Sequence, residues 1–102
     1  MEYFKVIYAM LAAFEAALDE QLDKEKLSAR YLGISEKRRT MLLLMLQDEG
    51  YLKGVQEFKT PFVHEVNIDH ARITIKGLDY LENNSNMQRA YRALKELSGF
   101  MQ

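Results

Sequence analysis

Basic and polar side chains gather in residues 35–60, and their types are those that contact nucleic acids. Arginine, threonine and glutamine form hydrogen bonds at base edges, while lysine and arginine also pair with phosphate oxygens. The segment therefore supplies candidates for binding double-stranded DNA, namely Lys37, Arg38, Arg39, Thr40, Gln47, Lys53 and Lys59. The alternative for Lys37, Arg38 and Arg39 is that they form only the solvated start of a helix.

A second polar group, at residues 64–70, contains both histidines of the chain together with Glu65 and Asp69. Strand alternation would place His64 and Glu65 on opposite faces, and the spacing of the histidines is not that of a helical metal site. The chain has no cysteine, and its five glycines are isolated, so thiolate chemistry and a glycine-rich phosphate loop are both excluded. We expect no enzyme activity, no metal and no cofactor.

The candidate DNA-binding residues lie on a helix and on the hairpin that follows it. Ser35 is a good N-cap, Glu36 suits the start of a helix, and Gly50 suits the left-handed residue that ends one. Residues 51–58 favour a strand, the only proline, Pro61, marks a turn, and residues 62–68 alternate as a second strand. A bend is expected at residues 67–70, after which residues 71–73 resume the strand.

This order of elements predicts an α+β, mainly α fold, a winged helix-turn-helix with an additional C-terminal helix. One domain covers residues 1–102, with the helix-turn-helix at about 24–49, the wing at about 51–73 and C-terminal helices at about 74–101. Asp23 is expected to cap a helix that continues to Leu32, and Thr74 to cap a helix with Ile75, Leu78 and Leu81 inward.

A helical wheel divides the third helix into two predicted faces. One face would be core and contains Met41, Leu42, Met45 and Leu46; the other would enter a major groove and contains Glu36, Arg39, Thr40, Leu43 and Gln47. Leu43 and Leu44 do not suit DNA, and they favour a protein partner instead.

The first and last helices carry wide apolar stripes. The first has Phe4, Ile7, Leu11, Phe14 and Leu18 at helical spacing, and the last runs from about Met87 to Met101. Apolar surface beyond what one small core can cover usually marks an interface. We therefore predict a homodimer through these helices, with an interface that includes Tyr3, Met10, Tyr91, Leu94 and Met101. The alternative is that the two helices pack only on each other within one chain.

Charge and composition leave both kinds of partner open. The net charge of the chain is −1, whereas residues 35–60 carry five basic and four acidic side chains. A dedicated DNA-binding protein more often has a clearly basic face. No apolar run approaches the roughly 20 residues of a membrane span, and the first residues do not have the pattern of a signal peptide. We expect a cytoplasmic protein without a membrane partner.

The segment Arg72-Ile-Thr-Ile-Lys-Gly-Leu-Asp-Tyr-Leu81 resembles the passage that ends the wing in several bacterial winged-helix families. Together with Gly50-Tyr51, Gly54, residues 82–87 and Ala90, it resembles the YjcQ-like family, a group of small, often prophage-borne bacterial proteins. The resemblance implies a winged-helix fold over nearly the whole chain, and it supplies no catalytic residues.

Two functions follow as hypotheses. The first is a DNA-binding phage or prophage transcriptional regulator that acts as a homodimer, with the third helix in the major groove and the wing on the backbone. The second is a protein–protein interaction module on the same scaffold, which binds through the third helix, because a fold does not dictate a function.

Overall fold

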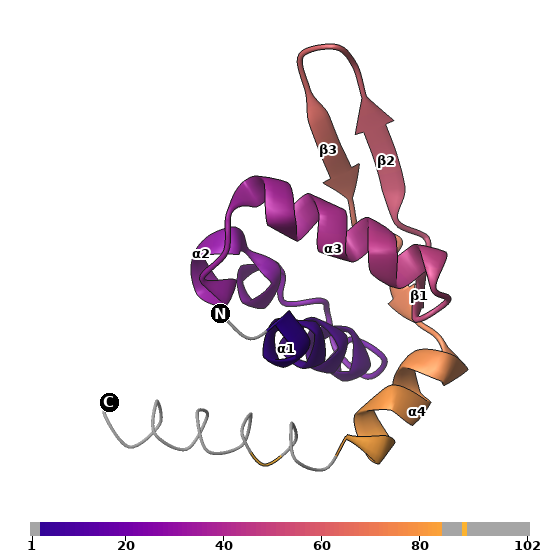
Figure 1. Cartoon of the computed structure of the whole chain (residues 1–102). Helices are drawn as coiled ribbons and strands as arrows, with labels where there is room; N and C mark the ends of the chain where they lie inside the picture. The colour runs from indigo at the N-terminus through magenta and orange to yellow at the C-terminus, as the bar shows by residue number, and fades with distance from the viewer. Residues whose placement is uncertain (1–2, 85–88, 90–102) are drawn as a thin grey trace.

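The computed structural model of the chain describes residues 3–84 and residue 89, and shows a mainly helical α+β arrangement with two small antiparallel sheets (Figure 1). In chain order the elements are α1 (Tyr3–Ala16), the 3-10 helix η1 (Lys24–Leu27), α2 (Ala29–Leu32), α3 (Glu36–Asp48), β1 (Leu52–Lys53), β2 (Gln56–Lys59), β3 (His64–Asn67), β4 (Arg72–Ile73) and α4 (Ile75–Asn83).

The predicted helix over residues 24–32 is divided into η1 and α2. Asp23 caps the first piece, since its carboxylate accepts a hydrogen bond from the N–H of Glu25. Ser28 has extended backbone angles and caps the second piece by accepting from the N–H of Tyr31 at 3.1 Å. A serine that starts a new helix inside a helical pattern therefore explains the break.

Helix α3 begins and ends where its sequence predicts. The hydroxyl of Ser35 accepts from the N–H of Arg38 at 3.1 Å. At the other end Gly50 has a φ of +85°, and the N–H of Tyr51 donates to the carbonyl of Leu46 at 2.8 Å. A left-handed glycine followed by this hydrogen bond is a common way for a helix to stop.

The strands form one interrupted hairpin that stands out from α3 (Figure 1). At its base Leu52 pairs with Ile73, and farther out Gln56 to Lys59 pair with His64 to Asn67. Between the two paired parts, one strand has residues 54–55 and the other residues 68–71. The predicted bend at residues 67–70 is confirmed, and so is the return to a strand at residues 72–73.

The core lies between α1, α3 and the base of the hairpin, and its largest fully buried side chains are Phe14, Met10, Leu11, Leu27, Leu43 and Leu52. The prediction that Ile75 points inward was wrong, because it is 81% exposed; on the apolar stripe of the first helix, Phe4 is 65% exposed and Leu18 56%. Helix α1 ends at Ala16, so Leu18 lies beyond it. Phe4 is the second residue of α1, and Ile75 is the first residue of α4.

One residue of the predicted interface through the first and last helices is not available to a second copy. Met10 is fully buried among the core side chains of a single chain, so none of its surface is left for a second copy. Tyr3 is 44% exposed. Tyr91, Leu94 and Met101, with the predicted last helix, lie outside the described residues. Within the described part of the chain, no helix is both long and apolar enough to span a membrane.

Candidate functional site

Three of the side chains predicted to contact DNA, those of Arg39, Thr40 and Gln47, are hydrogen-bonded or buried within the molecule. The guanidinium Nε of Arg39 donates to the carbonyl of Leu27 at 2.6 Å, which ties α3 to η1. Thr40 is buried, with 6% of its surface exposed. Base reading needs free side-chain donors and acceptors at a surface, whereas Arg39 binds η1 and Thr40 is buried.

Gln47 makes the most complete of these contacts. Its amide nitrogen donates to the carbonyl of Val55 at 3.0 Å, and its amide oxygen accepts from the N–H of Val55 at 2.7 Å. Val55 lies between β1 and β2, where it is buried and its peptide groups are outside the strand ladder. A buried peptide needs hydrogen-bond partners, and the glutamine side chain supplies them.

The inward face of α3 is the predicted one only in part, since Leu42 and Leu46 are buried as expected but Met41 and Met45 are not. Leu43 is fully buried and Thr40 nearly so, whereas Met41 and Met45 are 42% and 53% exposed. The reason is the hairpin, since α3 packs against both β1 and β3 as well as against the helical part of the core. The face with Thr40, Leu43 and Gln47 is the one turned to these neighbours, and the assignment of Leu43 to an outer face was wrong.

We call the opposite side of α3 the outward face and define it by Lys37, Arg38, Met41, Leu44, Met45, Asp48 and the C-cap residue Glu49. All are exposed except Leu44, which is half-buried. Its centre is apolar, its N-terminal end is basic and its C-terminal end is acidic. The side chain of Arg38 lies over the ring of Tyr3, with the guanidinium carbon 5.5 Å from the ring centroid, so this end of the face also contacts α1.

The four remaining predicted DNA contacts, Lys37, Arg38, Lys53 and Lys59, are exposed. The first two lie at the start of α3 and the other two on the hairpin strands β1 and β2. In the described residues the ion pairs join Lys24 to Asp69, Arg30 to Glu25 and His64 to Glu57, so none of these four cations has an acidic partner.

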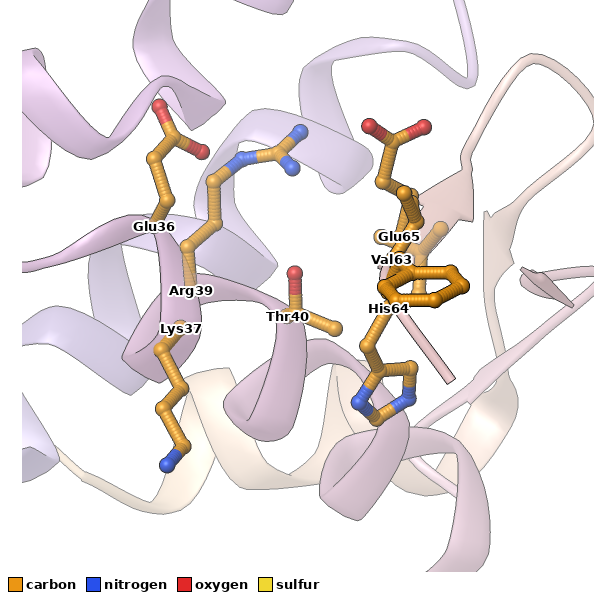
Figure 2. Close-up of a pocket in the computed structure, with 9 residues that line it drawn as sticks. Glu36, Lys37, Arg39, Thr40, Val63, His64 and Glu65 are labelled. Carbon is orange, nitrogen blue, oxygen red and sulfur yellow. The ribbon is translucent and has the colours of Figure 1, made fainter. Parts of the chain in front are cut away.

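An open groove of about 620 Å³ runs between the first half of α3 and the outer part of the hairpin (Figure 2). Its helix side is formed by Glu36, Lys37, Arg39 and Thr40, and its other side by residues 62–66. Charges of both signs line it, so its electrostatics favour neither a purely anionic nor a purely cationic ligand.

The tip of the hairpin is apolar. Phe62 is 94% exposed, Phe58 55% and Val63 45%. Thr60 shapes the turn, since its hydroxyl accepts from the N–H of Val63 at 3.0 Å and its own N–H donates to the carbonyl of Val63 at 2.8 Å. A tip with two exposed phenylalanines beside Lys59 is an unusual surface for contact with a phosphate backbone alone.

The histidine-containing segment forms no metal site among the described residues, in which no group of three metal-ligating side chains comes together. The ring Nε2 of His64 lies 2.7 Å from a carboxylate oxygen of Glu57 on the neighbouring strand. Asp69 pairs with Lys24, and this hydrogen bond and charge lower the pKa of the Asp69 carboxyl. Both are contacts at the protein surface.

The segment 72–81, which carried the family resemblance, forms the joint between the end of α3 and α4. The hydroxyl of Thr74 caps α4 by accepting from the N–H of Gly77 at 3.1 Å, and it donates to the carbonyl of Gly50. The ammonium of Lys76 donates to the carbonyl of Glu49 at 2.7 Å and lies over the ring of Tyr51. A Cβ at Gly77 would come within 2.6 Å of the Tyr51 carbonyl oxygen, so only glycine fits there.

Tyr80 completes this joint, with its ring edge-on to Tyr51 at a centroid distance of 5.6 Å. Its hydroxyl is buried and has no hydrogen-bond partner among the described residues. Burial, followed by the nearby Tyr51, raises the pKa of Tyr80. The motif residues therefore hold the fold together, and Lys76 among them contacts the C-terminal end of the outward face at Glu49. The sequence identified them, but it gave no indication that their role is to join two helices.

Comparison with family models finds one match, described as YjcQ protein, over residues 8–99. Comparisons with curated proteins and with solved structures found no significant match.

Proposed function

The chain belongs to the YjcQ family, and from this premise we propose that it is a winged-helix protein that binds another protein through the outward face of α3. In this scaffold α2, the turn at Gly33 and α3 are the helix-turn-helix, and the β2–β3 hairpin is the wing. The order of the elements and the antiparallel pairing of β2 with β3 support this assignment.

One observation carries the proposal. Met41 and Met45 are 42% and 53% exposed at the centre of the outward face, where a DNA-reading helix would need hydrogen-bonding side chains. Exposed methionines adapt their shape to apolar partners, and aromatic residues, methionine and arginine are enriched in protein interfaces. The polar side chains that suited base edges, Arg39 and Gln47, contact Leu27 and Val55 instead.

The proposal is tested by placing a photo-crosslinking amino acid at position 45 in cells that naturally encode the chain. The matched control carries it at Ile75, which is 81% exposed at the start of α4 and is not part of the outward face. We expect a discrete crosslinked protein from position 45, lost when Met41→Glu is added, and none from position 75. No crosslink from position 45, or the same products from both positions, would refute the proposal.

DNA binding is the second candidate function, and the four exposed cations without acidic partners favour it. In that case Lys37 and Arg38 would contact the backbone beside the major groove, and Lys53 and Lys59 would contact it from the wing. Paired half-sites bound by a homodimer would then supply the specificity of a regulator.

A titration of random duplex DNA at low and moderate salt tests this candidate. Each phosphate contact that is lost lowers the salt slope by about one, so Lys53→Ala with Lys59→Ala should lower it by about two. Both changes lie on the hairpin and leave α3 intact. Wild-type protein with no salt-dependent binding would exclude the candidate.

A further inference from the structure

The charges at the two ends of the outward face are arranged against the dipole of their own helix. Lys37 and Arg38 lie in the first turn of α3, where the dipole disfavours cations, and Asp48 and Glu49 lie at its end, where it disfavours anions. The last turn of α3 contains no basic residue of its own, and the cation at this end is Lys76 of α4, which donates to the carbonyl of Glu49 rather than to a carboxylate. An arrangement that is locally unfavourable indicates a role outside the isolated helix.

These four side chains also lack ion-pair partners within the described part of the chain. They are exposed and stand at opposite ends of an apolar centre formed by Met41, Leu44 and Met45. The face thus offers a basic end, an apolar middle and an acidic end, and a partner that covers it should present the same three parts in reverse order.

The spacing of the charges matches that requirement in the chain itself. Lys37 and Asp48 are eleven positions apart, and so are Arg38 and Glu49. Eleven residues make about three turns of an α-helix, so each pair falls on nearly the same line along the helix. Met41 and Met45 lie symmetrically between the two ends.

We infer that the protein which covers the outward face is a second copy of the chain, with the two α3 helices packed antiparallel about a two-fold axis. Lys37 then faces the partner's Asp48, Arg38 faces the partner's Glu49, and Met41 meets the partner's Met45. An isologous contact of this kind needs one surface that is complementary to itself, and the outward face meets that condition. The inference rests on the proposed function, and it names the partner.

This interface differs from the one that the sequence predicted, which used the first and last helices. It also differs in its consequences for DNA, because a helix covered along its length by a second copy cannot enter a major groove. The hairpin lies beside this face, since Lys37 also lines the groove between α3 and residues 62–66.

Two complementary charge variants test the inference by sedimentation equilibrium of the full chain. One carries Lys37→Glu and Arg38→Glu, and the other carries Asp48→Lys and Glu49→Lys. Each alone places like charges opposite one another, so we expect each to be monomeric under conditions in which the wild type is a dimer. An equimolar mixture restores both pairs of contacts, so the mixture should dimerise.

The helix dipole favours all four substitutions. Arg38→Glu also removes the contact with Tyr3, and Glu49→Lys adds a cation beside Lys76, so circular dichroism checks the fold of each variant. A control with Lys53→Glu and Lys59→Glu lowers the net charge on the hairpin by as much as Lys37→Glu with Arg38→Glu lowers it on α3, and this control should remain dimeric. We also expect the wild-type dimer to weaken as salt is raised, because exposed ion pairs are screened.

A mixture that stays monomeric, or a wild type that stays monomeric up to about 100 μM, would overturn the inference. The crosslink from position 45 separates this failure from failure of the proposed function. A crosslinked species of twice the chain mass supports both the dimer and the proposed function. A crosslink only to a different protein supports the proposed function and refutes the dimer, and the absence of any crosslink refutes both.

Discussion

The inner and outward faces of α3 each combine apolar and polar side chains. The inner face buries Leu42, Leu43 and Leu46, and it also contains Arg39 and Gln47, whose side chains bind the backbone of neighbouring elements. The outward face has Met41 and Met45 at its centre, exposed and without an apolar neighbour that covers them. Polar residues on a helix are thus no guide to its binding surface until the hydrogen bonds of nearby loops have been assigned.

The largest expected difference between the faces comes from two apolar positions. Leu43 is fully buried and Met45 is 53% exposed. We expect Leu43→Ala to lower the free energy of unfolding by about 2–5 kcal/mol, because it leaves a cavity in the core. Met45→Ala should change it by less than about 0.5 kcal/mol. Urea denaturation of the two variants measures both, and equal losses would remove the distinction between the faces.

A smaller effect is expected from the polar contact of the inner face. Gln47→Ala leaves the buried N–H and C=O of Val55 without partners, so we expect a loss of about 1–3 kcal/mol in the free energy of unfolding. Gln47→Glu keeps the acceptor for the N–H but places a carboxylate oxygen against the carbonyl of Val55, so it should also lower the free energy of unfolding at neutral pH. If both variants have the same melting temperature as the wild type in thermal denaturation, the Gln47 side chain is not needed for the fold.

Arg39 sharpens the comparison with its neighbour Arg38. Arg39→Ala removes the hydrogen bond to the carbonyl of Leu27, and we expect it to lower stability by about 1 kcal/mol. Arg38→Ala removes only a contact with the exposed ring of Tyr3 and should cost less. If Arg38→Ala lowers the free energy of unfolding more than Arg39→Ala does in urea denaturation, the assignment of the two arginines to the two faces is wrong.

The smallest effect belongs to neither face and serves as a baseline. Lys24 lowers the pKa of the Asp69 carboxyl in the folded protein. The stabilisation from this pair is present above the unfolded pKa of the carboxyl and is lost as the pH falls through its folded pKa. We expect Asp69→Asn to reduce the acid dependence of stability slightly, because both side chains are exposed. A loss as large as that of Gln47→Ala would contradict this ranking.

The sequence predicted the elements better than their faces, and the reason is physical. The caps at Ser35 and Thr74, the stop at Gly50 and the bend after Asn67 depend on a few neighbouring residues, and the structure confirms them. The orientation of α3 depends on where the hairpin packs, a contact between residues far apart in the chain. The need of Val55 for two hydrogen bonds is likewise invisible until the strands are paired.

Of the predicted site, the sequence identified cations that are exposed, but it assigned Met41 and Met45 to the core. A wheel that places the most apolar residues inward cannot distinguish an apolar surface from a core face. The unfavourable placement of charges at both ends of α3 was the signal in the sequence that could have identified the outward face.

The most direct test of the outward face is methionine methyl NMR of the full chain, in which Met41 and Met45 report on this face and Met10 on the core. We expect the resonances of Met41 and Met45 to shift as the protein concentration is raised, those of Met10 to stay in place, and none of the three to shift when random duplex DNA is added to dilute protein. If the resonances of Met41 and Met45 do not change with protein concentration and shift only when DNA is added, the outward face is not a protein interface.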